Sequence, residues 1–146
     1  MFLGFGSNGS TGIALGPSID ITSNTTISNF AFSVSHDGTI TSVAAFFSVV
    51  LVSFPIAGTT ITIRAQLYRS VTPNNIFLPV PGTLVTLSPT LTGLSTLGNV
   101  TNGIIQGLAI PVTAQTRLLM VFSATAQGTQ LNNQILAHYG AGVTIV

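Results

Sequence analysis

Apolar and polar residues alternate along much of the chain, and this pattern predicts β-strands. In residues 58–70 the odd positions from 61 to 67 are apolar, while the even positions are Thr, Arg, Gln and Tyr. A period of two is typical of a strand with one face in a hydrophobic core. Further strands are predicted at residues 29–35, 39–53, 83–87, 107–112, 116–126 and 142–146.

Turn signals separate these segments. The sequence His36-Asp37-Gly38 lies between the strands predicted at 29–35 and 39–53, and an Asp-Gly pair tolerates the positive φ angles of a tight turn. We therefore expect these two strands to form a hairpin. Helix signals are nearly absent, because the chain has no Glu or Lys and is rich in β-branched residues. Short strands with frequent turns predict an all-β jelly-roll sandwich of about 8–10 strands.

One predicted strand, the segment RLLMVFSATA, is apolar on both of its faces. Leu118, Met120 and Phe122 share one parity, and the two residues between them are apolar as well. Such a strand has to be covered on both sides. The second cover is either another layer of the same chain or a neighbouring subunit, and periodicity alone does not decide between them. The scarcity of charge favours a subunit contact, because interface cores are depleted of charged residues.

Two strands supply the candidate residues for that contact. On the strand at 58–70, the positions opposite in parity to the core include Thr62, Gln66 and Tyr68. We expect a homotrimer in which some of these side chains face a neighbouring copy. The full set of candidate trimer-interface residues is Thr62, Gln66, Tyr68, Leu118, Met120 and Phe122.

Charge is scarce throughout the chain. Only 3% of the 146 residues are charged and the formal net charge is +1, whereas a typical soluble domain has about a quarter charged residues. This balance excludes the electrostatic footprint of a protein that binds nucleic acid or an anionic membrane surface. Residues 40–57 reach the length of a membrane span, about 18 residues. Serines and Pro55 interrupt that run, and no Lys or Arg flanks it closely, so we expect no membrane insertion.

Candidate catalytic and metal-binding groups are few. The titratable side chains that could take part are His36, His138, Asp20 and Asp37. No Gly-x-Ser-x-Gly nucleophile motif is present, and no cysteine is available as a metal ligand. Asp37 is explained as a turn residue and Asp20 as a loop residue or ion-pair partner. We expect a protein that is not an enzyme, with no catalytic, cofactor-binding or metal-ligating residue and no cofactor.

The N-terminal segment differs from the rest of the chain. Gly6, Gly9 and Gly12 recur at every third position, the spacing that a collagen triple helix requires. We predict two regions: a glycine-rich linker or the end of a collagen-like stalk at residues 1–17, and a globular head domain at residues 18–146.

Several segments together resemble one known family. They are AFSVSHDGTITS from residue 31, ITIRAQLYRSVTPNN from residue 61, PVPGTLVTLSPTLTG from residue 79 and GLAIPVTAQTRLLMVFSATAQG from residue 107. These stretches are similar to the C-terminal domain of collagen-like exosporium glycoproteins of the BclA- and BclB-related kind, from spore-forming bacilli.

That resemblance implies a trimeric jelly roll like those of the C1q and tumour-necrosis-factor group, which caps a collagen-like filament on the bacterial spore surface. It implies an extracellular location in the exosporium, with the chain itself and other exosporium or spore-appendage proteins as partners. The calcium site of some C1q-group proteins is not expected here, because acidic residues are so few. An adhesin or lectin-like tip and a viral fibre knob remain alternative functions.

Overall fold

The computed structural model describes residues 16–23, 30–53, 58–72, 74–92, 97–128 and 134–146. These residues form β-strands joined by turns, and no helix occurs among them. No helix in this part of the chain has the length and hydropathy that a membrane crossing requires. The strands are β1 (Ile19–Asp20), β2 (Phe32–Ser33), β3 (Gly38–Ser53), β4 (Thr60–Ser70), β5 (Ile76–Pro79), β6 (Val85–Thr86), β7 (Leu91–Thr92), β8 (Val100–Val112), β9 (Arg117–Gln127) and β10 (Gln134–Ile145).

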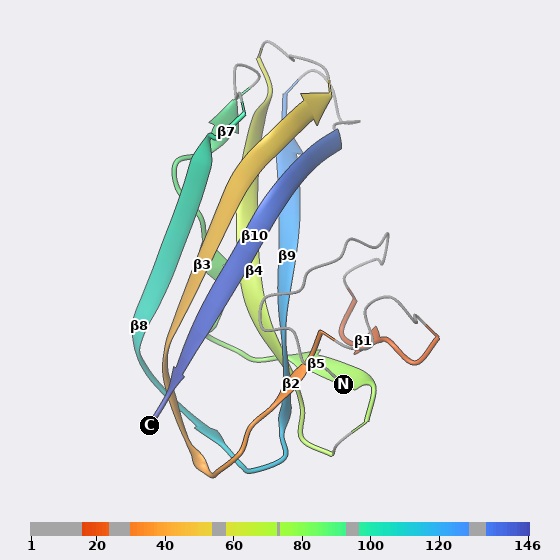
Figure 1. The fold of residues 1–146 in the computed structure, drawn as a ribbon, viewed down its shortest axis with the longest axis vertical. Helices are drawn as coiled ribbons and strands as arrows, with labels where there is room; N and C mark the ends of the chain where they lie inside the picture. The colour runs from red at the N-terminus through yellow and green to blue at the C-terminus, as the bar shows by residue number, and fades with distance from the viewer. Residues whose placement is uncertain (1–15, 24–29, 54–57, 73, 93–96, 129–133) are drawn as a thin grey trace.

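The strands are arranged in two layers (Figure 1). The smaller sheet has the strand order β10-β3-β8. The larger sheet has the order β1-β5-β4-β9-β2, and β6 and β7 also pair with β4. Every pairing between these strands is antiparallel. This two-layer antiparallel architecture confirms the predicted all-β jelly-roll sandwich.

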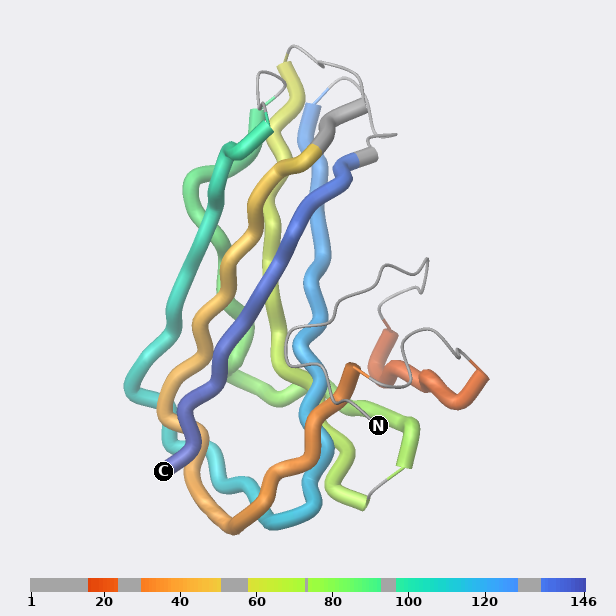
Figure 2. The backbone as a smooth tube through the Cα atoms, in the orientation of Figure 1, coloured from red at the N-terminus to blue at the C-terminus, as the bar shows by residue number. Residues whose placement is uncertain are grey.

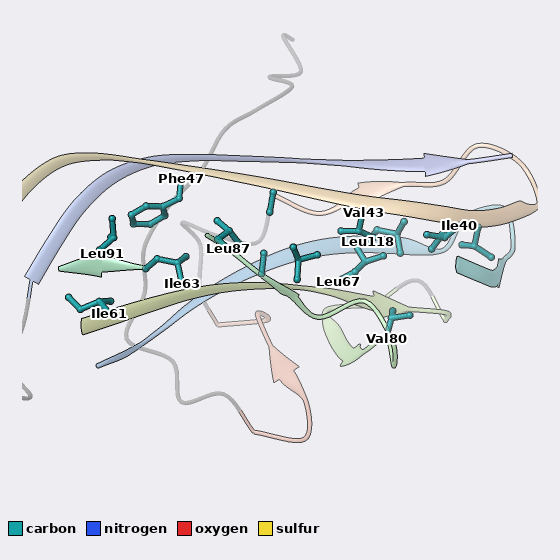
Figure 3. Close-up of a cluster of buried hydrophobic side chains, with 14 of the residues drawn as sticks. Ile40, Val43, Phe47, Ile61, Ile63, Leu67, Val80, Leu87, Leu91 and Leu118 are labelled. Atoms are coloured by element: carbon teal, nitrogen blue, oxygen red, sulfur yellow. The ribbon is translucent and has the colours of Figure 1, made fainter. Parts of the chain in front are cut away.

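The main hydrophobic core lies between the two layers. Val43 and Phe47 of β3 point from the smaller sheet towards Ile63 and Leu67 of β4 (Figure 3). Leu118 of β9 joins the same cluster and is completely buried. The alternation along residues 61–67 therefore identified the core face of β4 correctly, because side chains two residues apart lie on the same face of a strand.

A second, smaller cluster covers the outer face of the larger sheet where β1 and β5 lie. It consists of Ile19, Ile21, Tyr68, Phe77 and Leu119, with Phe30, Ala31 and Val121 packed against it. Arg117 closes this cluster, since its guanidinium lies 5.3 Å from the centre of the Phe77 ring. The same guanidinium donates to Oδ1 of Asn75 at 2.8 Å. Ile19 and Ile21 thus pack the segment of residues 16–23 onto the sandwich by apolar contacts.

The predicted hairpin of residues 29–35 and 39–53 is wrong. β2 pairs with β9 in the larger sheet, whereas β3 pairs with β10 and β8 in the smaller one. The turn between them carries the chain from one layer to the other (Figure 2). Asp37 contributes to this path, because its Oδ1 accepts a hydrogen bond from the N–H of Ala114 at 2.7 Å. Its carboxylate therefore ties the turn to the β8–β9 connection.

Two strands are longer than predicted. β8 begins at Val100, seven residues before the strand predicted at 107–112, and runs continuously through Asn102 and Gly103. Gly107 lies within β8 at a φ of 73°, where the pairing with β3 shifts register, so the glycine permits a bulge and the strand continues. β10 begins at Gln134, eight residues before the strand predicted at 142–146. The alanine and glycine residues of β10 interrupt the alternation of apolar and polar side chains, so the pattern did not predict this part of the strand.

Gly103 lies where the edges of the two sheets approach each other. A Cβ atom at this position would lie 2.8 Å from Cγ1 of Val85 and 3.0 Å from the carbonyl oxygen of Thr86. The backbones of Ser88 and Asn102 also pair as an isolated bridge beside it. Only a residue without a side chain fits here without displacing β6.

We expect Gly103→Ala to lower the free energy of unfolding by about 1–3 kcal/mol, the usual cost of overpacking. Chemical denaturation at one fixed chain concentration measures it. Ser123→Ala, on the outer face of β9, is the control and should change stability by about 0.5 kcal/mol or less. Equal stabilities for both variants would show that the contact between the sheet edges is looser than described.

Candidate assembly surface

The predicted interface residues of β4 lie on the outer face of the larger sheet. Thr62 and Gln66 are half-buried there, with Thr125 and Val121 of β9 as their cross-strand neighbours. The exposed Arg64 lies between them on the same face. Away from the second cluster, this face is therefore made of hydroxyl and amide side chains with one positive charge.

Of the remaining candidates, two are enclosed by the chain itself and two are partly buried. Tyr68 is 4% exposed and belongs to the second cluster, and Leu118 is fully buried in the main core. Met120 and Phe122 are partly buried against the main core. The Phe122 ring also lies 5.1 Å from the ring of Tyr139 on β10. Tyr68 and Leu118 thus leave almost no surface for another chain to contact.

Both apolar faces of β9 are covered within one chain. The face that carries Leu118 packs into the main core, and the face that carries Leu119 packs into the second cluster. The structure therefore corresponds to the single-chain alternative for this strand. The candidate interface residues of this strand and the trimer itself stay predictions.

The smaller sheet has an outer face that sequence reasoning did not single out. Along β10 the odd positions pack against the core, so its even positions from 136 to 144 point outwards. The pairing of the three strands places these residues in cross-strand rows. From one end of the sheet to the other the rows are His138–Ser48–Val100, Gly140–Phe46–Asn102, Gly142–Ala44–Ile104 and Thr144–Ser42–Gln106.

Large apolar side chains are exposed on this outer face. The exposed fractions are 39% for Val100, 44% for Phe46 and 58% for Ile104. The exposed Asn102 lies between Val100 and Ile104 on β8, so polar and apolar side chains alternate there. None of the charged residues of the chain lies on this face; they are Asp20, Asp37, Arg64, Arg69 and Arg117. The face combines apolar surface with a complete lack of formal charge, apart from the titratable His138.

On the same face, β10 has two positions without a side chain, Gly140 and Gly142. A Cβ atom placed on Gly140 or on Gly142 would meet no atom within 4 Å. Their row neighbours on β3 are Phe46 and Ala44. The sequence conceals this arrangement because residues 43–47 form an unbroken apolar run, in which parity does not tell which phenylalanine faces outwards.

Asp20 and His36 make hydrogen bonds to residues close to them in the chain. The carboxylate of Asp20 accepts hydrogen bonds from the hydroxyl and the N–H of Thr22, which lower its pKa. Nδ1 of His36 lies 3.2 Å from Oγ of its neighbour Ser35. Burial raises the pKa of Tyr139. Among the described residues, no three His, Cys, Asp or Glu side chains gather into a group that could hold a metal ion.

Comparison with known proteins gives one significant similarity. The chain is 38% identical over 98 residues to "Collagen-like protein 1" of Acanthamoeba polyphaga mimivirus. The match covers 66% of this chain and 10% of the mimivirus protein. No protein-family profile matches the chain, and no solved structure matches it. The similarity relates this chain to a collagen-like protein, and the narrower resemblance to exosporium glycoproteins stays a prediction.

Proposed function

We propose that this chain is a non-catalytic head domain that forms a homotrimer and caps a collagen-like filament. The observation that carries this proposal is the 38% identity to a collagen-like protein over two thirds of the chain. Support also comes from the glycines at every third position between residues 6 and 12, although they lie outside the described residues.

Three copies follow from the physics of the filament. A collagen triple helix winds three chains around one axis, with glycine at every third position. Before the chains can wind, their ends must be held together in register. A trimeric head supplies this by raising the effective concentration of the three stalk ends. The shortage of charge suits such a domain, because three identical copies meet without strong like-charge repulsion.

The molar mass of the 146-residue chain in detergent-free buffer tests the proposal. Light scattering after size exclusion should give a mass near three chains of 15.0 kDa each. A mass of one chain across the micromolar range would contradict self-association. A chain that stays in solution only with detergent would contradict the expectation that it does not insert into membranes.

Two settings for the filament follow from different observations. The resemblance of the segments from residue 31 to residue 128 to exosporium glycoproteins supports the surface of bacterial spores. The similarity to a mimivirus protein supports the second candidate, the knob of a fibre on a virus particle. Immunogold labelling of intact spores and virions with an antibody against this chain separates the two, because only the particle that carries the filament is labelled.

A further inference from the structure

The segment of residues 16–23 is held on the larger sheet by both backbone and side-chain contacts. β1 pairs with β5 (Figure 1), and the N–H of Ile21 donates to the carbonyl oxygen of Asn75 at 2.9 Å. Ile19 is 4% exposed and Ile21 is 0% exposed, and both belong to the second cluster. Neither belongs to the main core. The segment is therefore bound to the outside of the sandwich and does not help to close the space between the two sheets.

The loop residues that receive this segment are themselves fixed. Oδ1 of Asn74 accepts hydrogen bonds from the hydroxyl of Ser70 and from the N–H of Ile76, both at 2.8 Å. The Arg117 guanidinium donates to the carbonyl oxygen of Asn74 and to Oδ1 of Asn75. Arg117 belongs to β9, which is an inner strand of the larger sheet. Asn75, whose carbonyl oxygen accepts the hydrogen bond from the segment, is thus tied to the body of the sandwich.

We propose that residues 16–23 form a fixed joint through which the head domain holds the end of the filament. The inference rests on the proposed function, in which the filament joins the head on the N-terminal side of this segment. Docking of Ile19 and Ile21 fixes the chain from Gly16 onward, whereas without docking the tether between filament and sandwich would extend to Phe30. The effective concentration of tethered ends falls with about the −3/2 power of tether length or more steeply. The docked segment therefore keeps three stalk ends close together and favours their winding.

A stalk of known sequence provides the test. About ten Gly-Pro-Pro triplets, which wind into a triple helix, are joined ahead of Met1 of the full chain. Ile21→Asp puts a charge into the second cluster, so the segment should leave the sheet. The tether of each chain then roughly doubles, and the equilibrium constant for winding of the stalk should fall by about fivefold or more. Circular dichroism of the stalk during heating measures this change, and light scattering should still give the mass of three chains.

A matched control lies in the same segment. The side chain of Asp20 is exposed and does not belong to the second cluster. Asp20→Asn should therefore leave the winding of the stalk unchanged, since the contacts of Ile19 and Ile21 stay in place.

A rescue by a disulfide distinguishes a joint from a merely structural role. Asp20 and Ile76 lie directly opposite each other in antiparallel strands, a separation that a disulfide can span. The chain has no cysteine of its own. When Asp20→Cys and Ile76→Cys are added to Ile21→Asp, oxidation should return the winding of the stalk towards the parent's value, and reduction should lower it again.

The possible outcomes separate this inference from the proposed function. Unchanged winding in Ile21→Asp, with the head still trimeric, would overturn the joint and leave the proposed function intact. An oxidised disulfide that does not restore winding would also overturn it, because the loss would then come from the head itself. If Ile21→Asp does not assemble, Ile19→Ser is measured in the same way, since it removes part of the docking contact without burying a charge. A parent chain with the mass of one copy would overturn the proposed function itself.

Discussion

Phe77→Ala is expected to lower the free energy of unfolding by about 3–5 kcal/mol, the range for a large aromatic side chain deleted from a packed core. Phe77 belongs to the second cluster and is the largest of the fully buried side chains among the described residues. Its ring also contacts the Arg117 guanidinium at 5.3 Å, an interaction that alanine cannot make. The variant should therefore loosen both Ile19–Asp20 and the loop that Arg117 binds.

Urea denaturation of the parent and the variant at the same chain concentration measures this effect, since any self-association makes stability depend on concentration. Phe32→Ala is the matched control, because Phe32 is 43% exposed and its truncation should cost about 1 kcal/mol. Equal losses for the two variants would contradict the second cluster. In that case the N-terminal segment would not be packed on the larger sheet as described.

Leu118→Ala should cost about 2–5 kcal/mol, which is a large part of the 5–15 kcal/mol typical of a whole domain. Leu118 is 0% exposed and lies between the layers. The loss combines the transfer free energy of the deleted methyl groups with the cavity that the rigid sheets leave behind. If Leu118 instead faced a neighbouring subunit, the main loss would be one of assembly.

Thermal unfolding and light scattering on the same samples separate these two results. The expected outcome is a lower midpoint of unfolding with the parent's oligomeric state retained at low temperature. Leu78→Ala is the control, because Leu78 is 55% exposed and should change stability by about 0.5 kcal/mol or less. A folded variant of unchanged stability that no longer self-associates would return Leu118 to the interface.

The predicted fold class came from features that are local in sequence. In β4 the alternation of residues 61–67 identified both the strand and its core face. Such a prediction succeeds because neighbouring side chains of a strand always point to opposite faces, whatever the partner strand is. The bounds of β3, at Gly38–Ser53, also follow closely from its run of β-branched and aromatic residues.

Pairing partners were harder to predict, because they depend on residues far apart in the chain. The Asp37-Gly38 turn has the composition of a hairpin, yet the chain passes into the other sheet there, and the Asp37 carboxylate accepts a hydrogen bond from the N–H of Ala114. No local pattern contains that contact. β10 was underestimated because its glycines have low strand propensity, and its long pairing with β3 joins residues far apart in the chain.

At the candidate assembly surface, too, local patterns were predictable from the sequence and contacts between distant residues were not. The sequence by itself determined a β-sandwich with few charges and, in the part of the chain that the structure describes, no helix, because composition and period are properties of the chain alone. Only the tertiary structure decided which apolar residues are enclosed. It buried Leu118 and Tyr68, exposed Phe46 and Ile104, and left open space beside Gly140. The physical reason is that the exposure of an apolar side chain depends on which other strand lies over its face.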